Sequence, residues 1–326
     1  MVEAEMGAYG PGIIWTGSLN ESLLAAVEAT KAVELRLYRD NLIPMDAFEI
    51  LRELPQLVGL SVSPNRRLAS SDWDVIHGLT NLRYLHHSGD QVSGTLSLEN
   101  LPCLEWLSMP WWPGLRGLAE TNLFGLLLRK WKSGKPASRL PETVRALGIT
   151  QGDEESAVQA SCLPRLQHLT LAKCRGVHSL AELSSLSELR ELSLIGLRSL
   201  EAVGSQALPR GLRVVDIEDC PRLKAVDLAA LQDLKGFFVL GSTGLRTQDV
   251  ILPTHDRLTH VRVPSLARLA GIEEKGADDH SVVRPPDYKY RMRCIRRYSD
   301  VVQLRHARSR LYPDWFREAF PERCIE

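Results

Sequence analysis

The residues that could do chemistry in this chain are few and scattered. His86 and His87 are adjacent, and six cysteines stand at positions 103, 162, 174, 220, 294 and 324 without a CxxC pair. Neighbouring side chains of a strand point to opposite faces, so the two histidines cannot chelate one metal ion. The sequence has no P-loop, no G-x-S-x-G, no H-E-x-x-H and no dinucleotide fingerprint. It therefore predicts a protein that is not an enzyme and that uses no metal and no cofactor.

One thiol has surroundings that favour reactivity. Cys294 lies among Arg291, Arg293, Arg296 and Arg297, whose positive charge lowers a thiol pKa when the thiol is exposed. The sequence places no histidine or acid as its partner. An unrecognised activity at Cys294 is therefore the least favoured of the functions considered.

Composition and charge exclude some classes of partner. The chain has 326 residues, with 40 Lys and Arg against 40 Asp and Glu, so its net charge is zero and attracts neither nucleic acid nor an anionic membrane. Its first residues, MVEAEMGAYGPGIIWTG, lack the basic start of a secretory signal. No apolar run reaches the roughly 18 residues of a membrane helix. These features predict a cytoplasmic protein with reduced cysteines.

Leucines recur in a frame that positions the remaining side chains. Leu166, Leu169, Leu171 and Cys174 fill positions 1, 4, 6 and 9 of a unit L-x-x-L-x-L-x-x-C. The frame recurs at intervals of 19 to 25 residues, a period typical of stacked repeats. Eleven units begin at Ala32, Leu57, Leu82, Leu104, Leu123, Val144, Leu166, Leu189, Leu212, Leu234 and Leu258.

These units resemble the leucine-rich repeat family, whose pattern is L-x-x-L-x-L-x-x-N/C-x-L, in the form of a stand-alone bacterial-type solenoid. LPETVRAL and LPRGLRVV also look like the LPxxL-type repeats of bacterial leucine-rich effectors. Effectors that act as ubiquitin ligases add a large catalytic domain, whereas only about 55 residues follow the repeats here. The likeness to ligases therefore stops at the repeats.

The resemblance implies an α/β fold, a leucine-rich repeat solenoid. It has a curved parallel sheet on the concave face, short helices or irregular turns on the convex face, and helical caps. We expect an amino-terminal cap over residues 1–31, the solenoid over 32–270, and a linker with a basic and aromatic carboxy-terminal cap over 271–326. Ser18 and Glu21 form a capping box that predicts a helix in the first cap. Position 9 departs from Asn or Cys at Trp112, Trp131 and Gly152, so we expect irregular coils near 104–152.

The fold implies a non-enzymatic module that binds another protein on its concave face, which carries positions 3 and 5. Two clusters stand out there, one aromatic and basic, the other acidic. Trp, Tyr and Arg dominate binding hot spots, although the tryptophans could equally pack an irregular coil. The predicted partner-binding residues are Tyr84, His86, Trp106, Trp111, Arg129, Lys130, Asp216 and Glu218.

Two alternatives remain open. The segment from Arg284 to Arg310 carries nine Lys and Arg against two acids, with interleaved tyrosines, and predicts binding of nucleic acid or phosphate. The chain could also be an effector or a toxin-neutralising protein. The sequence predicts no membrane partner and leaves the oligomeric state open.

Overall fold

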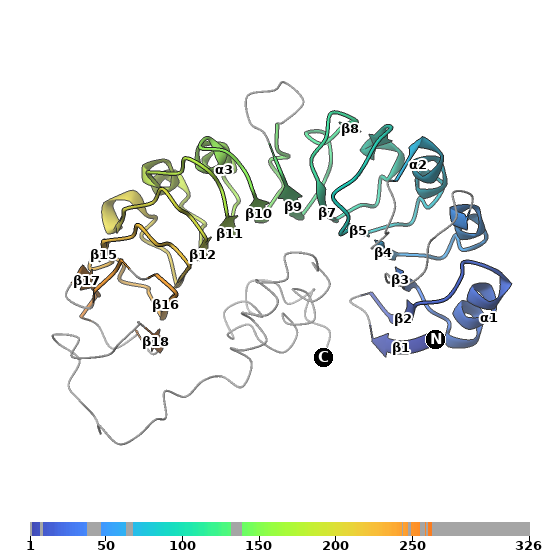
Figure 1. Cartoon of the computed structure of the whole chain (residues 1–326), viewed down its shortest axis with the longest axis horizontal. Coiled ribbons are helices and arrows are strands. Elements are labelled where there is room, and N and C mark those ends of the chain that lie inside the picture. The colour runs from blue at the N-terminus through green and yellow to red at the C-terminus, as the bar shows by residue number, and fades with distance from the viewer. Residues whose placement is uncertain are drawn as a thin grey trace, which may run out of the picture. The chain divides into compact units, whose positions relative to one another are not determined.

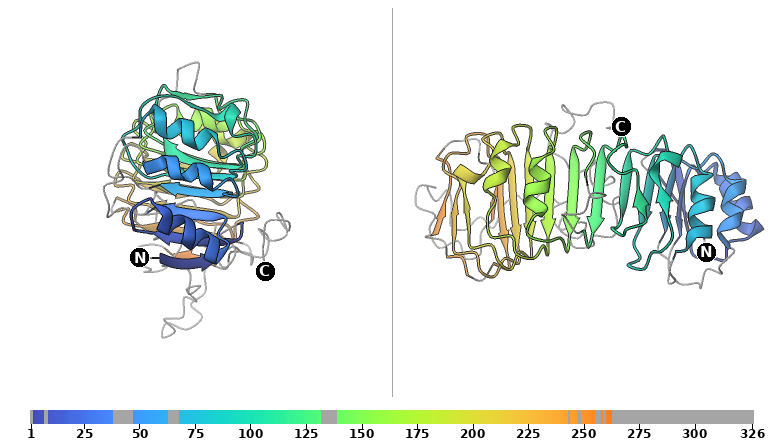
Figure 2. Two further views of the ribbon diagram at one scale, coloured as in Figure 1. Left: turned by 90° about the vertical axis from the view of Figure 1, so that its right-hand side faces the viewer. Right: turned by 90° about the horizontal axis from the view of Figure 1, so that it is seen from above.

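The computed structural model of the chain describes residues 2–6, 9–37, 47–62, 68–131, 139–242, 244–246, 249–254, 258 and 260–262. This part of the chain forms two compact units, which we call unit 1, up to Asn122, and unit 2, from Leu123. Each unit is described by itself. Within each, the strands lie side by side along one side, and the helices and turns lie on the other (Figure 1 and Figure 2).

Each predicted repeat contributes one strand to a parallel sheet. Within the described residues, a strand begins at position 3 of all eleven repeats. In unit 1 these are β3 (Glu34–Leu37), β4 (Gly59–Val62), β5 (Tyr84–His87) and β7 (Trp106–Pro110). In unit 2 they are β9 (Gly125–Arg129), β10 (Ala146–Thr150), β11 (His168–Ala172), β12 (Glu191–Ile195), β14 (Val214–Glu218), β16 (Gly236–Leu240) and β18 (His260–Arg262).

The leucines of the frame are in register and form the core. Leu169 pairs with Leu147 on one side and with Leu192 on the other. Leu169 and Leu171 are at most 1% exposed. One coil is too thin to bury such side chains alone, so the coils stack and share one core. This arrangement confirms the predicted α/β repeat solenoid with its parallel sheet.

Within the described residues, the side opposite the sheet holds short elements, because each return segment has few residues. The α-helices are α1 (Glu21–Thr30), α2 (Ser70–His77) and α3 (Ser156–Ser161). The 3₁₀ helices are η1 (Ala47–Glu53), η2 (Leu98–Asn100), η4 (Ala181–Ser185) and η5 (Ser205–Ala207). Small parallel sheets join β6 (Leu96–Ser97) to β8 (Leu115–Arg116), and β13 (Ala202–Gly204) to β15 (Ala225–Asp227) and β17 (Val250–Ile251).

The amino-terminal helix is present, but its cap differs from the predicted one. Helix α1 begins after Asn20, whose side chain accepts a hydrogen bond from the Ser22 backbone N–H at 3.1 Å. Ser18 lies two residues further back, where its carbonyl oxygen accepts from the Trp15 indole at 3.0 Å. The capping box at Ser18 is therefore wrong, because another good capping residue stands closer to the first turn.

Two strands precede α1. Strand β2 (Pro11–Trp15) runs parallel to β3, and β1 (Val2–Met6) pairs antiparallel with β2 on its other side. Residues 13–15 therefore lie inside the sheet, between β1 and β3. The parallel stacking therefore begins one strand before the first repeat.

A left-handed turn ends the strands of unit 2. Position 8 has a positive φ in six successive coils, with values between 52° and 63°. The Gln151 backbone N–H donates to the Ala172 carbonyl at 2.8 Å, and Lys173 donates to Ile195 at 2.6 Å. The backbone ladder thus continues one residue past each strand. The residues are Lys130, Gln151, Lys173, Gly196, Asp219 and Gly241.

The sequence predicts irregular coils near 104–152; the strands described there are regular, and residues 132–138 of these coils lie outside the described residues. Strands β9 and β10 pair over five residues without a break, and Lys130 and Gln151 adopt the same left-handed turn as their neighbours. Trp131 occupies position 9 with its side chain 1% exposed. A buried ring therefore closes this coil where the family uses a short polar side chain.

Candidate functional site

The face of the sheet opposite the leucine core carries positions 3, 5 and 7, and we call it the sheet face. In unit 1, Tyr84 pairs in register with Trp106, and His86 with Ser108. His86 Nδ1 lies 2.9 Å from Ser108 Oγ. Unit 1 therefore brings the predicted Tyr84, His86 and Trp106 together on adjacent strands. Trp111 follows directly after β7.

In unit 2, the predicted residues fall in two separate places. Arg129 ends β9, and Lys130 occupies the left-handed turn after it with an exposed side chain. Asp216 and Glu218 lie on β14, which three intervening strands separate from β9. The basic and acidic predicted residues of this unit are thus not neighbours.

The predicted partner-binding residues are mostly buried. The alternation of the strands places them on the sheet face but does not indicate this burial. Apart from Lys130, each has a side chain between 1% and 9% exposed. The same face buries a polar pair in unit 2, where His168 Nδ1 lies 3.1 Å from Glu191 Oε2.

Two aromatic neighbours of the predicted cluster belong to the core. His87 is 1% exposed, and its ring meets the edge of Trp73 at a centroid distance of 6.4 Å. Trp112 stacks on Trp73 at 5.6 Å, and its indole N–H donates to the Gly94 carbonyl at 3.0 Å. Packing therefore accounts for Trp112.

The buried cysteines hold the positions of the repeat ladder. The Cys174 thiol lies 3.6 Å from the Ile149 carbonyl oxygen of the preceding coil, and the Cys220 thiol lies 3.8 Å from that of Leu194. Burial raises the pKa of Cys220 to about 11. Such a thiol stays protonated and unreactive at neutral pH.

No group of three metal-binding side chains occurs among the described residues. In that same part of the chain, no helix is long and apolar enough to cross a membrane. Cys294, Cys324 and the basic segment 284–310 lie outside the described residues.

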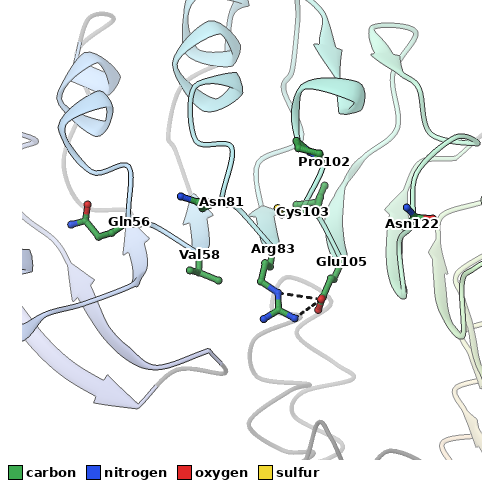
Figure 3. A pocket seen from close by; sticks show the side chains of 9 residues that line it. Gln56, Val58, Asn81, Arg83, Pro102, Cys103, Glu105 and Asn122 are labelled. Atoms are coloured by element: carbon green, nitrogen blue, oxygen red, sulfur yellow. Dashed lines mark hydrogen bonds and ion pairs between the residues drawn. The ribbon is translucent and has the colours of Figure 1, made fainter.

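A hollow of about 540 Å³ lies in unit 1, where the strands begin (Figure 3). We call this margin of the sheet the start edge, and it carries position 2 and the residue before each repeat. Exposed Gln56, Asn81, Cys103 and Asn122 lie on successive coils in this hollow. The remaining lining residues are Val58, Arg83, Pro102, Leu104 and Glu105.

An ion pair fixes one side of the hollow. Arg83 and Glu105 point toward each other, with Arg83 Nε 3.1 Å from Glu105 Oε1 (Figure 3). The Tyr9 hydroxyl donates to Glu105 Oε2 at 3.0 Å, and the Arg83 guanidinium lies 4.6 Å from the Tyr9 ring centre. Burial acts to lower the pKa of Arg83, but the hydrogen bond and charge of Glu105 raise it overall. The lining offers amide donors and acceptors beside a small apolar surface.

Sequence reasoning missed the hollow because it followed only positions 3 and 5. The signal was present in the frame. In four successive repeats, the residue before the repeat is polar or small: Gln56, Asn81, Cys103 and Asn122. Position 2 of the first three of these repeats is Val58, Arg83 and Glu105. Following every column of the repeat, including those outside the strand, would have found it.

Comparisons with known proteins give likenesses of low identity. No family model matches the chain, and no curated protein matches it. An internalin from Listeria monocytogenes is 12% identical, with a TM-score of 0.38 over 66% of this chain and 79% of its own.

Two further solved structures are similar to the chain. The plant peptide hormone receptor RGFR1, in complex with RGF2, is 14% identical with a TM-score of 0.34 over 72% of this chain, which spans 45% of the receptor chain. The leucine-rich repeat domain of APL1B is 16% identical, with a TM-score of 0.34 over 73% of this chain and 77% of its own. The repeat frame of the sequence and the in-register parallel strands that begin at its third position give this chain the fold of a leucine-rich repeat solenoid.

Proposed function

We propose that this chain is a non-enzymatic protein-recognition module that binds another protein on the concave sheet face. The observation that carries the proposal is the chemistry of that face. Arg36, His86, Arg129, Asp216 and Glu218 project from positions where a sheet that served only for packing would carry apolar residues. Charged and polar groups spread over a face complement those of a polar polypeptide, which supports a protein partner for this face.

Within this proposal, the two units contribute different chemistry. Unit 1 supplies the aromatic cluster of Tyr84, His86, Trp106 and Trp111, and unit 2 supplies Arg129 and Lys130. Aromatic residues in desolvated positions dominate binding energy, often with about 2 kcal/mol or more for each. Asp216 and Glu218 place two acids on the sheet face of unit 2, where their charge orients a partner with basic residues.

The test is affinity capture from a lysate of the native host with three forms of the chain. These are the wild type, a sheet-face variant (Tyr84→Ala with Trp106→Ala) and a start-edge variant (Asn81→Ala with Asn122→Ala). We expect one protein to be retained by the wild type and the start-edge variant and lost by the sheet-face variant. Circular dichroism and thermal unfolding confirm that all three are folded, and Trp106→Phe gives a milder change if the double variant is not.

Other outcomes contradict different parts of the proposal. Loss of the protein only from the start-edge variant would make the sheet-face site wrong while protein recognition stands. Capture of nucleic acid alone, released by salt, would favour the basic segment 284–310 over the module.

A further inference from the structure

The start edge of unit 2 carries a row of basic side chains that the sheet face does not use. Position 2 of five successive coils is Arg145, Gln167, Arg190, Arg213 and Lys235, which we call the basic row. The backbone N–H of each donates to the carbonyl oxygen of the one before it, at 2.8 to 2.9 Å. Neighbouring strands lie about 4.8 Å apart, so the row extends for about 19 Å.

Arg190, at the centre of the row, is anchored by one nitrogen. Its Nη1 donates to the carbonyl oxygens of Ser187, Leu189 and Gly211 at 3.0, 3.3 and 3.4 Å. Within the described residues, its Nε and Nη2 make no hydrogen bond. A Cβ at Gly211 would clash with Nη1, so the glycine leaves the space that the guanidinium fills. The half-buried guanidinium is thus held in place with a planar pair of N–H donors still available.

Like charges adjoin Arg190 along the row. Burial lowers the pKa of Arg190 and the neighbouring Arg213 lowers it further, while Glu188 and Asp233 act in the opposite direction. Lys235, on the next coil, is exposed. A carboxylate that bound to Arg190 would accept bidentate hydrogen bonds from its Nε and Nη2, and it would lie close to the positive charge of Arg213.

We propose that the basic row, centred on Arg190 and Arg213, is a docking surface for an acidic segment of another protein. A nucleic acid fits less well, because the acids Glu188 and Asp233 interrupt the row and would repel a continuous polyanion. Separate Asp and Glu side chains of a polypeptide can meet the guanidinium groups and avoid those acids. This proposal does not depend on the sheet-face site, since the two share no residue.

The probe is a fluorescein-labelled peptide of alternating glutamate and serine, measured by fluorescence anisotropy with the full chain. We expect it to bind the wild type and to weaken as salt increases, since exposed charges are screened. Arg190→Gln with Arg213→Gln should weaken binding about tenfold or more, because charge-assisted hydrogen bonds are lost. The matched control, Arg175→Gln with Arg198→Gln, changes two exposed arginines outside the row and should bind like the wild type.

Gly211→Ala provides a second test that keeps every charge. Its Cβ displaces the Arg190 guanidinium, so the peptide should bind more weakly although circular dichroism shows an intact fold. Equal binding by the wild type and the double glutamine variant would overturn the proposal. So would no detectable binding of the peptide, or equal binding of a matched peptide of glutamine and serine. Tighter binding of an oligodeoxythymidine of equal length would replace the acidic protein with a nucleic acid.

Discussion

At the scale of single residues, the cysteines divide by their place in the repeat. Cys174 and Cys220 stand at position 9 and are buried, whereas Cys103 and Cys162 lie before a repeat or in a turn and are exposed. Burial raises the pKa of Cys220 to about 11 from an ordinary value of 9.0. The thiolate is the reactive form, so burial and protonation protect Cys220 together.

We therefore expect selective alkylation by N-ethylmaleimide at pH 8. In a variant with Cys294→Ser and Cys324→Ser, Cys103 and Cys162 should be modified in the native protein, and Cys174 and Cys220 only after unfolding in urea. Peptide mass spectrometry identifies the modified positions. Rapid native modification of Cys220 would contradict its burial in the ladder.

At this scale, the sequence predicted which side chains of a strand point into the leucine core. His87 stands at position 6 of its repeat, on the side of the inward leucines, and Trp73 meets its ring in the core. The alternation gives no information about what covers the opposite face. Because of this, the burial of Tyr84 and Glu218 on the sheet face was not predictable from their positions.

At the scale of elements, the left-handed turn at position 8 decides how each coil of unit 2 leaves its strand. Lysine, glutamine and aspartate adopt this conformation in four of the six coils, and glycine in two. A left-handed conformation costs an L-residue roughly 1–2 kcal/mol, whereas glycine adopts it freely. The turn therefore forms without strain in the two coils that carry glycine at position 8.

Gly196→Ala should lower the free energy of unfolding by about 1 kcal/mol, because alanine must then adopt φ near 62°. The added Cβ would also lie 3.1 Å from the Lys173 side chain. Urea unfolding followed by circular dichroism measures the change. The reverse substitution, Lys173→Gly, should give a smaller gain, since glycine also increases the entropy of the unfolded chain.

Gly204→Ala is the matched control for this prediction. Gly204 lacks a positive φ, and no heavy atom lies within 4 Å of an added Cβ. Its substitution should leave the stability nearly unchanged. Equal destabilisation by both alanines would show that loss of glycine, and not the left-handed turn, is responsible.

The frame predicted the strands better than the segments outside them. All eleven strands begin where L-x-x-L-x-L predicts, because the spacing of inward leucines is set by the strand itself. The cap of α1 was misplaced because Ser18 and Asn20 are both capping residues; in the structure Asn20 caps the helix, and the Ser18 carbonyl oxygen accepts a local hydrogen bond from the Trp15 indole. The start edge was missed because its residues lie outside the strand, where no alternation marks them.

At the scale of the whole molecule, stability comes from contacts between neighbouring coils. Leu192 is fully buried, and its strand pairs with β11 on one side and β14 on the other. A solenoid of this kind behaves as a one-dimensional array in which each coil is stabilised by its neighbours. Damage to one coil should therefore spread with decreasing effect along the array.

Leu192→Ala should destabilise the chain by about 2–5 kcal/mol, as large-to-small core substitutions do. Hydrogen exchange followed by mass spectrometry should show the greatest loss of protection in β12, then in β11 and β14, and less in β9. The exposed substitution Ser184→Ala, in the return segment that leads to β12, serves as the control and should leave protection unchanged. Uniform loss across all strands of unit 2 would instead indicate a single cooperative block.

The backbone ladder of unit 2 also determines how this part of the chain bears mechanical load. Its hydrogen bonds run from coil to coil, while the covalent chain winds around the stack. Tension applied through the chain ends would load the bonds of the terminal coil and leave those further in unstrained. The solenoid would then yield by peeling, coil after coil, at a low force. Extension would release roughly the length of one repeat at each step.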